Sequence, residues 1–497
     1  MYGSLPLFDT HAARLLDARA TTLLGGDGYA LMQRAGQAGW QHVLQHWPAA
    51  HRITVVCGPG NNGGDGYVLA RLAHRSGRLV TVLHLAEHVP TTELSQRACT
   101  EYVAVGGEIA LFPESVPHGD LLVDAMFGIG LSRPPDTFAT ALIDAINAQP
   151  APVFALDVPS GLDADKGSAP GKAVIASRTL QFISRHSGLH TGQALEHTGQ
   201  LELEELDVAD EVFSTVESGP TLLTQEALSY WLLPRRRNTH KGESGRALCI
   251  GGDHGHGGAI LLCAEAALRS GAGLLNVATR EAHVPALLAR RPEAMALAAE
   301  SGDELKPLLS QANAIAIGPG LGQGDWGRAT LKLALAAGKP LVLDADALNL
   351  IAAGVFALAG DADAILTPHP GEAARLLGTD TADVQRDRFA AAQAIAERYR
   401  AVVVLKGAGT IIAAPARKPR VIDAGNPGMA VGGMGDVLTG VIVALRAAGL
   451  PAFDAASAGA LMHSLAGDAA AELGERGLLP SDLFPHLRHL ANPEEVN

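Results

Sequence analysis

The fold follows from residues 53–66, ITVVCGPGNNGGDG, where a short apolar strand (Ile53–Cys57) runs into a glycine-rich loop (Gly58–Gly66). The pattern over Tyr67–Ser76 then predicts a helix. Five glycines in nine loop residues predict φ > 0 conformations and close approach of the backbone to a ligand. A loop that leaves a strand and opens a helix offers free N–H groups to a phosphate. Taken alone, it also fits a plain connector in which Asp65 caps the helix.

Outward from this stretch, apolar strands alternate with helical patterns in two series. The first series continues through predicted strands at Leu79–Leu85, Leu121–Asp124 and Pro152–Leu156. The second follows Pro234 and a basic run (Arg235–Arg237), with predicted strands at Ala247–Ile250, Leu275–Ala278, Ala314–Ile317, Leu341–Leu343, Ile365–Thr367 and Val402–Leu405. Its predicted helices include Gly258–Ser270, Gly371–Leu377, Asp436–Ala448 and Asp454–Leu473. This alternation predicts α/β domains with mainly parallel sheets.

The length of the chain predicts at least two domains. Single hydrophobic cores stop growing well short of 497 residues. The acidic, weakly patterned stretch Leu201–Pro220 lies between the two series and is predicted to hold the junction. A content of 57 glycines with only 4% aromatic residues suits α/β layers with many tight turns.

Composition excludes several function classes. A formal net charge of −14 disfavours nucleic-acid binding but not a small phosphorylated ligand. The four cysteines form no CxxC pair, which indicates reduced core residues rather than disulfides or zinc ligands. The N-terminus has no secretory pattern, and no apolar run approaches the ~20 residues of a membrane span. We therefore expect a cytoplasmic protein without a membrane anchor.

Polar residues follow two further strands of the first series. The segment LVDAMFGIGL (residues 122–131) carries Asp124, and ALDVPSGLDAD (residues 155–165) carries Asp157 and Ser160. Because carboxyl ends of parallel strands share one edge of a sheet, Asn62, Asp124 and Ser160 are expected to converge as oxygen ligands for an alkali or alkaline-earth ion. The alternative for Asp124 alone is a helix N-cap.

The second series contains its own glycine-rich helix start, Gly432–Asp436. Small residues bring N–H groups near a phosphate, and the helix N-terminus complements its charge. Asp436 there is suited to accept a proton from a substrate hydroxyl that meets a phosphoryl group. The alternative is a simple N-cap aspartate.

Four other strand ends favour a phosphate site with Asp436 as proton acceptor over the simple N-cap. They are Lys406–Thr410, Thr367–Glu372 with His369 between two prolines, Gly318–Gly322 and Gly251–Ala259. A cation and a small-residue turn at Lys406 suit the phosphates of a nucleotide. The alternative for Lys406 is a solvated surface lysine, and the alternative for His369 alone is a structural histidine. So many glycine-rich strand ends in one domain exceed what connectors require.

The motifs of the first half resemble those of the YjeF N-terminal domain family, the NAD(P)H-hydrate epimerases, over most of residues 1–218. The matching segments are GNNGGDG, Asp124 to Leu131 and DVPSGLDAD. The resemblance implies a Rossmann-like three-layer fold and a potassium site at Asn62, Asp124 and Ser160. It implies substrate contacts at Asn61, Asn62, Gly63, Gly64, Asp65, Gly128, Ile129, Gly130, Leu131, Ser132, Arg133, Pro134 and Asp157. Ile129 stands where threonine is common in that family.

The second half resembles the carbohydrate-kinase-like NAD(P)H-hydrate dehydratases of the ribokinase fold, over about residues 222–490. The segments HKGESG, GPGLG, DADALN, TPHPGE, KGAGT and GNPGMAVGGMGD carry the match. It implies a three-layer domain at 222–497, with hydrate contacts at Ala259, Gly320 or Gly322, His369 and Asp436. Nucleotide contacts are implied at Lys406, Gly407, Ala408, Gly409, Thr410 and Gly435.

The two halves in this order resemble fused bacterial enzymes that repair hydrated NAD(P)H. The first half is expected to interconvert the R and S hydrates, with Asp157 either transferring a proton or only binding. The second is expected to dehydrate the S hydrate, with Asp436 as the base and ADP, bound with magnesium, giving AMP and phosphate. Expected partners are NADHX, NADPHX and ADP, in a homo-oligomer. The alternative is a vitamin kinase, for a hydroxymethylpyrimidine or thiazole alcohol, fused to a Rossmann-like binding module.

Overall fold

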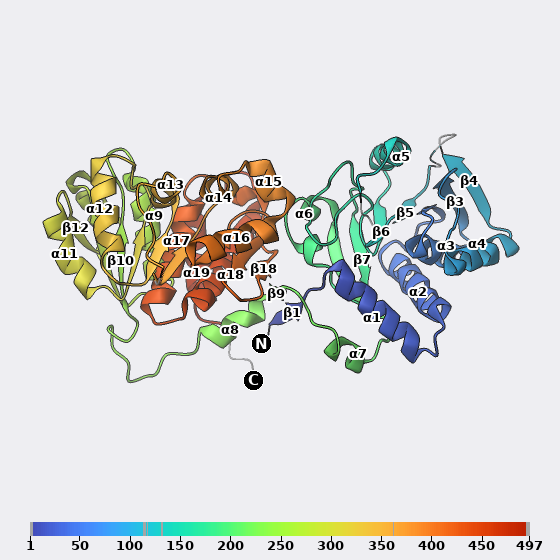
Figure 1. The fold of residues 1–497 in the computed structure, drawn as a ribbon, viewed down its shortest axis with the longest axis horizontal. Coiled ribbons are helices and arrows are strands. Elements are labelled where there is room, and N and C mark those ends of the chain that lie inside the picture. The colour runs from blue at the N-terminus through green and yellow to red at the C-terminus, as the bar shows by residue number, and fades with distance from the viewer. Residues whose placement is uncertain (1–2, 113–115, 117, 131–132, 361, 494–497) are drawn as a thin grey trace. The chain divides into compact units, whose positions relative to one another are not determined.

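The chain folds into two compact α/β units. The computed structural model describes residues 3–112, 116, 118–130, 133–360 and 362–493 (Figure 1). One unit is Pro6–Pro220, and the other is Thr221–Asn497 together with Met1–Leu5. The chain therefore passes from one unit to the other twice, next to Leu5 and next to Pro220.

The first unit is built on a seven-stranded parallel sheet. Its strand order is β4-β3-β2-β5-β6-β7-β8. The strands are β2 (Arg52–Cys57), β3 (Leu79–Leu85), β4 (Glu108–Phe112), β5 (Leu121–Ala125), β6 (Val153–Leu156), β7 (Arg178–Phe182) and β8 (Gln200–Glu204). Its helices are α1 (Thr10–Leu23), α2 (Gly28–His46), α3 (Asn61–Arg75), α4 (Glu93–Ala104), α5 (Thr137–Asn147), α6 (Ala194–His197) and α7 (Asp210–Ser214).

Both faces of this sheet are buried, which explains why its central strands read as continuous apolar runs. Successive side chains of a strand point to opposite faces. Val55 therefore joins the core beneath α2, α3 and α4, and Val56 joins the core beneath α5. The order reverses at β2 and β5, so their carboxyl ends form the switch point at which such sheets bind ligands.

The second unit is built on an eleven-stranded sheet of order β1-β9-β18-β17-β16-β15-β14-β13-β10-β11-β12. Pairing is parallel from β16 through to β12 and antiparallel from β16 through β17 to β18. The strands are β1 (Ser4–Pro6), β9 (Thr221–Leu223), β10 (Arg246–Ile250), β11 (Leu274–Thr279), β12 (Met295–Ala298), β13 (Ala314–Ile317), β14 (Leu341–Leu343), β15 (Ala364–Leu366), β16 (Val402–Leu405), β17 (Thr410–Ala413) and β18 (Arg420–Ile422).

Helices cover both faces of this sheet as well. Cys249 of β10 points into a core with α9, α17, α18 and α19, and Leu248 points into the opposite core, with α11 to α14 and α16. The helices are α8 (Leu228–Trp231), α9 (Gly257–Arg269), α10 (Val284–Arg290), α11 (Gly302–Gln311), α12 (Asp325–Leu335), α13 (Ala345–Ala352), α14 (Pro370–Leu377), α15 (Thr381–Arg386), α16 (Arg388–Tyr399), α17 (Met434–Ala447), α18 (Ala452–Ala470) and α19 (Leu483–Leu490).

The predicted strands are confirmed to within a residue or so at each end, but the glycine-rich segment of the first half differs from its prediction. Helix α3 begins at Asn61 rather than at Tyr67, so most of the predicted loop is helical. None of the glycines of Gly58–Gly66 has positive φ. A Cβ on Gly63 would lie 2.0 Å from the oxygen of Gly58, and one on Gly64 would lie 2.4 Å from Cε of Met32. These glycines are therefore needed for close packing.

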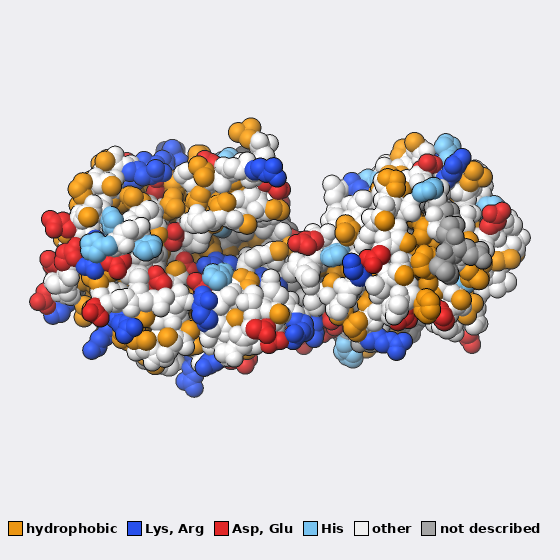
Figure 2. Space-filling view, turned by 90° about the horizontal axis from the view of Figure 1, so that it is seen from above, with side chains coloured by type: hydrophobic (Ala, Val, Ile, Leu, Met, Phe, Trp, Pro, Cys, Tyr) orange, Lys and Arg blue, Asp and Glu red, His pale blue; other side chains and the backbone are white. Residues whose placement is uncertain are grey.

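Surface and core agree with the charge and cysteine patterns. On the face in Figure 2, the described acidic and basic side chains are interspersed, unlike the one-signed face that binds nucleic acid. All four cysteines are free thiols, and only Cys99 is partly exposed. Within the described ranges, every helix is too short or too polar to traverse a bilayer.

Candidate functional site

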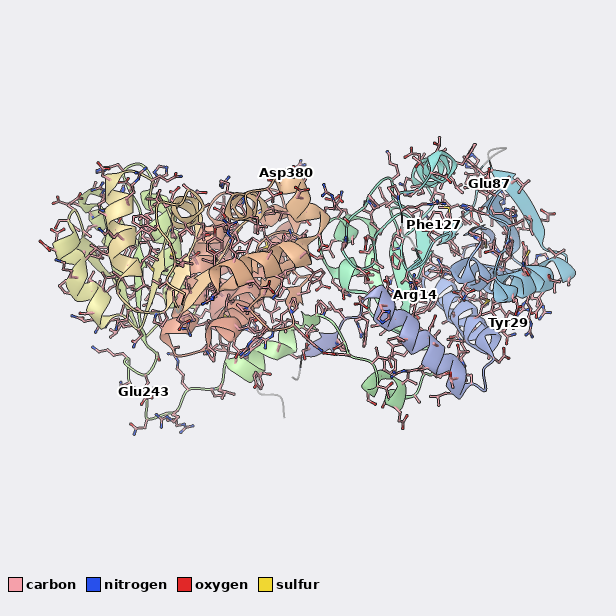
Figure 3. All side chains as sticks on the ribbon, viewed as in Figure 1. Arg14, Tyr29, Glu87, Phe127, Glu243 and Asp380 are labelled. Carbon is pink, nitrogen blue, oxygen red and sulfur yellow. The ribbon has the colours of Figure 1, made fainter. Side chains whose placement is uncertain are left out.

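A cavity of about 490 Å³ opens at the carboxyl edge of the sheet in the first unit. Arg14 of α1 and Phe127, after β5, line it and are labelled in Figure 3. The cavity is also lined by the start of α2, the start of α3 and the turns after β6 and β7. The lining residues proposed from the sequence are Asn61, Asn62, Asp65, Gly128, Ile129, Gly130 and Asp157.

Asp157 pairs with a buried histidine in this cavity. Its Oδ1 lies 2.8 Å from Nε2 of His186, and its Oδ2 accepts a hydrogen bond from the Ile129 N–H at 3.3 Å. His186 is 2% exposed, and its backbone N–H donates to Gln181 Oε1 at 2.7 Å, which fixes this turn. Asp157 itself has φ of 65°. Such backbone strain costs about 1–3 kcal/mol and is characteristic of functional sites.

Two further carboxyl groups face the same cavity. Asp17 comes from α1 and Asp65 from the first turns of α3. Burial and then the negative charge of Asp157 raise the pKa of Asp17 to about 6, although His186 opposes the shift. Burial, Asp157 and Asp17 likewise raise the pKa of Asp65 well above its usual value. The cavity thus combines one His–Asp pair with carboxyl groups that hold protons more readily than usual.

The oxygen ligands expected for a cation lie beside this cavity. Asp124, at the end of β5, accepts hydrogen bonds from the Ser160 hydroxyl at 2.6 Å and the Ser160 N–H at 2.7 Å. Burial raises the pKa of Asp124 to about 6, although these hydrogen bonds oppose the shift. Asn62 donates from Nδ2 to the Leu156 oxygen at 3.2 Å, whereas its buried Oδ1 has no hydrogen-bond partner among the described residues. An unpaired amide oxygen and a buried carboxylate fit a hard cation that prefers oxygen ligands.

Four other residues expected in this site do not line the cavity. Gly63 and Gly64 are buried in packing, and Arg133 and Pro134 are exposed outside the cavity lining. Leu131 and Ser132 lie outside the described residues.

The second unit has a network of buried charges at the carboxyl edge of its own sheet. Asp344 follows β14, is 1% exposed and accepts a hydrogen bond from Lys406 Nζ at 2.9 Å. The hydroxyls of Thr367 and Thr439 donate to the same carboxylate at 2.8 and 3.0 Å. Burial opposes ionisation of Asp344, but Lys406 and the hydroxyls outweigh it and hold its pKa below the usual value.

Lys406 is therefore not the solvated surface lysine of the simpler alternative. Its Nζ also lies 3.8 Å from Glu372, and the two carboxylates raise its pKa despite burial. A Cβ on Gly435 would lie 3.1 Å from this ammonium group. A side chain at 435 would therefore crowd the ammonium group, and glycine avoids this crowding. Lys406 and Gly435, both expected at the nucleotide, are thus neighbours.

Asp436 is not an N-cap residue. Helix α17 starts at Met434 with Gly433 as its N-cap at φ of 97°, which places Asp436 within the first turn. Burial and the charge of Asp344 raise the pKa of Asp436 to about 7, against the opposing effect of Lys406. A carboxyl group that titrates near neutral pH is suited to accept a proton.

His369 begins α14 and borders the same network. Its Nδ1 accepts hydrogen bonds from the N–H groups of Gly371 and Glu372 at 3.0 and 3.3 Å. Its Nε2 lies 3.6 Å from Glu372, and its side chain is 50% exposed. Burial and the cations Lys406 and Arg375 lower its pKa, although Glu372 opposes them. The neutral ring thus has an accessible face.

The glycine turns of this unit need positive φ. Gly320 and Gly322 have φ of 58° and 71°. A Cβ on Gly320 would lie 3.2 Å from that of Ala259, at the start of α9, and the Gly322 N–H donates to Asp346 at 2.9 Å. The three residues expected at the hydrate, Ala259, Gly320 and Gly322, are therefore grouped at one corner of the sheet edge.

A buried arginine supports the loop after β16. Arg388 is 0% exposed, and its guanidinium donates to the oxygens of Leu405, Lys406 and Gly409 at 3.3–3.4 Å. Gly407 and Ala408 are exposed, and Thr410 donates to the Gly407 oxygen at 3.2 Å. Arg388 thus holds in shape the turn that is expected to meet the nucleotide.

Three site residues were missed by sequence reasoning. His186 and Asp17 lie on segments without a motif, and only the fold brings them to Asp157. Asp344 belongs to the segment DADALN, which was noted only for its resemblance. A carboxylate directly after an apolar strand was the available signal for Asp344.

The comparisons with known proteins agree with the two-unit structure. The family described as YjeF-related protein N-terminus matches residues 28–188, and the family described as NAD(P)H-hydrate dehydratase matches residues 247–488. The bifunctional NAD(P)H-hydrate repair enzyme Nnr of Coxiella burnetii is 47% identical, over 94% of this chain and 95% of that protein. Its counterpart in Escherichia coli is 45% identical, over 96% and 92%.

Solved structures match the second unit. An ADP/ATP-dependent NAD(P)H-hydrate dehydratase from Bacillus subtilis, co-crystallised with ATP and Mg²⁺, is 32% identical with a TM-score of 0.50, over 55% of this chain and 97% of that one. A ribokinase-like superfamily protein from Enterococcus faecalis is 33% identical with a TM-score of 0.52, over 54% and 94%.

The fold and the sites define a two-domain α/β enzyme with a Rossmann-like unit followed by a ribokinase-like unit. The chain belongs to the family of bifunctional NAD(P)H-hydrate repair enzymes. Relatives that match both halves at once favour this assignment over a vitamin kinase fused to a binding module.

Proposed function

We propose that the first unit epimerises the R and S hydrates of NADH and NADPH, and that the second dehydrates the S hydrate with ADP. The observation that carries this proposal is the pair of separate carboxylate sites, Asp157 with His186 and Asp436 with Lys406, within a chain of this family. The proposed domain limits are 1–218 and 222–497.

In the second unit, the hydrate hydroxyl attacks the β-phosphoryl group of ADP and loses its proton to Asp436. The bond to AMP breaks as the new phosphate ester forms. The lone pair of the ring nitrogen then expels inorganic phosphate, and loss of a ring proton restores NAD(P)H. His369, Ala259 and Gly320 or Gly322 border the hydrate. The products are NAD(P)H, AMP and phosphate.

The nucleotide occupies the turn Lys406–Thr410 and the start of α17 at Gly435. The N–H groups of a helix start and an ammonium group are the usual partners of phosphate. Lys406 is already held by Asp344 at 2.9 Å, so its charge is positioned before the nucleotide arrives. Magnesium accompanies the nucleotide and neutralises part of its charge.

In the first unit, Asp157 transfers the proton that epimerisation requires, and His186 orients its carboxylate. Asn61, Asn62 and Asp65 at the start of α3, together with Gly128, Ile129 and Gly130, hold the hydrate. Asn62, Asp124 and Ser160 would hold a potassium ion, whose charge would neutralise the buried carboxylate of Asp124. We further infer a cytoplasmic homo-oligomer.

The test is to incubate the protein with mixed hydrate epimers, with and without ADP, and to follow the absorbance of reduced nicotinamide. Complete recovery of NAD(P)H only with a nucleotide, together with stoichiometric inorganic phosphate, is expected. Accumulation of a phosphorylated alcohol without recovery of NAD(P)H would instead indicate a kinase.

A further inference from the structure

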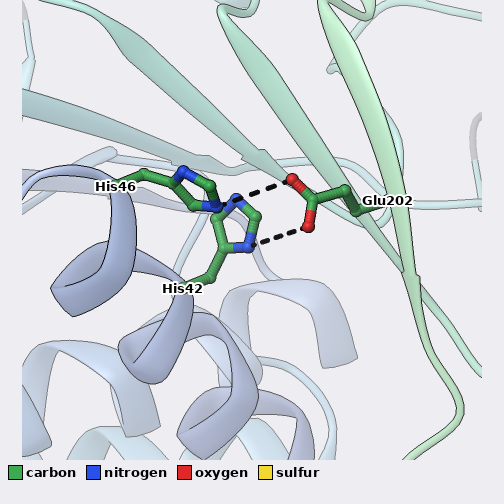
Figure 4. A group of neighbouring side chains, drawn as sticks. All are labelled: His42, His46 and Glu202. Carbon is green, nitrogen blue, oxygen red and sulfur yellow. Dashed lines mark ion pairs between the residues drawn. The ribbon is translucent and has the colours of Figure 1, made fainter.

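Two histidines and a glutamate meet outside the cavity, at the far end of one of the helices that line it. His42 and His46 lie one turn apart near the end of α2, and Glu202 lies on the edge strand β8 (Figure 4). The i, i+4 spacing puts both imidazoles on one face of the helix, with ring centroids 4.3 Å apart. The three side chains thus converge from two elements.

The distances within this cluster are too long for hydrogen bonds. Glu202 Oε1 lies 3.6 Å from His46 Nε2, and its Oε2 lies 3.8 Å from His42 Nδ1. Nε2 of each histidine is buried and has no hydrogen-bond partner among the described residues. His42 is only 6% exposed. Buried polar atoms without a partner cost about 1–3 kcal/mol each, so the cluster is unfavourable unless something else binds it.

The surrounding residues hold the cluster in place. The ring of Phe154, on β6, stacks on His42 with centroids 4.7 Å apart and planes 14° from parallel. Arg178, on β7, donates to Glu202 Oε1 at 2.5 Å. Ligating carboxylates in metal sites are typically held by such a hydrogen bond.

We propose that His42, His46 and Glu202 form a binding site for a divalent transition-metal ion, with Zn²⁺ as the ion that their chemistry favours. Two imidazoles and one carboxylate are a recognised zinc ligand set that leaves a fourth position for water. Tetrahedral bonds of about 2.1 Å place ligand atoms roughly 3.4 Å apart. One ligand atom from each residue already lies within 4.8 Å of the others, so binding of the ion would require the side chains to approach one another by about 1 Å.

The surroundings of His42 disfavour its charged form. Burial, followed by the charges of His46 and Arg178, lowers its pKa to about 4 against the opposing effect of Glu202. These three groups are the titratable side chains that face it.

A metal ion here would tie the end of α2 to the edge strand β8. The beginning of α2, at Gly28, Leu31, Met32 and Ala35, lines the cavity of the same unit. The ion would therefore stabilise a helix that shapes the ligand site without touching the ligand. This role is independent of the proposed repair reactions.

The test is equilibrium dialysis of the tag-free full chain against zinc chloride, with bound zinc measured by atomic absorption. His46→Gln is expected to weaken the binding of one zinc ion by at least ~100-fold, because loss of even an outer partner of a metal ligand costs 10–100-fold. His51→Gln is the matched control, since His51 is exposed and lies outside the cluster. Equal zinc binding by wild type and His46→Gln would overturn the proposal.

Fluorescence gives a second readout that does not depend on other zinc sites. The ring of Trp47 lies 6.2 Å from that of His42 and 6.1 Å from that of His46. Binding of Cu²⁺ or Ni²⁺ at the site is expected to quench Trp47, and this quenching component should be absent from both Trp47→Phe and His46→Gln. Identical quenching in wild type and Trp47→Phe would contradict a metal at this place, even if the chain binds metal elsewhere.

Discussion

The two sites of this chain place a carboxylate at the carboxyl edge of a parallel sheet, but they surround it differently. Asp157 faces His186, whose Nε2 lies 2.8 Å from its Oδ1. Asp436 lies between a carboxylate, Asp344, and the ammonium group of Lys406, and its pKa rises to about 7. The comparison shows that the topology of the sheet determines where the carboxylate lies. The charged and polar groups next to a carboxylate determine its pKa.

The largest expected effect concerns Asp436. In Asp436→Asn the base is removed while the start of α17 keeps a polar side chain. We expect dehydration of the S hydrate to fall by at least ~100-fold, the usual scale for loss of a general base. Single-turnover kinetics with saturating ADP measure it. If most of the turnover remains, another group accepts the proton.

A loss of comparable size is expected in the first unit but for the other reaction. Asp157→Asn should slow epimerisation about 100-fold, because a proton-transfer group is lost. His186→Gln should have a smaller effect, since the carboxylate remains but its orientation does not. NMR exchange between the R and S hydrates gives both rates. Dehydration of pure S hydrate serves as the control, and a matching loss there would mean that the two sites are not separate.

The Asp436→Asn substitution, which lowers activity, should raise the stability of the fold. Its pKa is 3.8 in an unfolded chain and about 7 in the fold, so the folded state prefers the protonated carboxyl group. Stability that is present below pH 4 is therefore lost as the pH rises through 7. Asp436→Asn should then unfold with a free energy about 2 kcal/mol higher than wild type at pH 8, part of the ~4 kcal/mol that the shift implies. The gain should shrink at pH 5; a gain that is independent of pH would point to another cause.

The same pKa predicts a pH profile for the second site. Because Asp436 must be ionised to accept a proton, kcat/KM for the S hydrate should rise tenfold per pH unit below about 7 and level off above it. A stopped-flow series in constant ionic strength gives the profile. A rise centred near pH 4 would show that the carboxyl group is not perturbed in the working enzyme.

The sequence predicted the sheets better than the site. Strands such as Leu79–Leu85 and Val402–Leu405 were predicted with their observed bounds, because a strand buried on both faces is a continuous apolar run. The start of α3 was wrong because Gly63 and Gly64 look like loop residues. Their packing against Gly58 and Met32 depends on contacts that local pattern does not contain.

Contacts between side chains that are distant in the sequence could not be predicted either. Asp157 was singled out at a strand end and Asp436 at a glycine-rich helix start, but their partners are distant in the chain. His186 reaches Asp157 from the turn after β7, and Asp344 reaches Lys406 across the sheet edge. Perturbed pKa values arise from such partners, so they could be stated only once the fold was known.

The most direct test of separate sites is to give the Asp157→Asn variant pure S hydrate and pure R hydrate in turn, each with ADP, and to follow the recovery of NAD(P)H. The account predicts that S hydrate is converted at the wild-type rate, whereas R hydrate is recovered about 100-fold more slowly than by the wild type. Addition of the Asp436→Asn variant should then restore conversion of the R hydrate. Equal conversion of both hydrates by Asp157→Asn alone would contradict the division of labour between the two units.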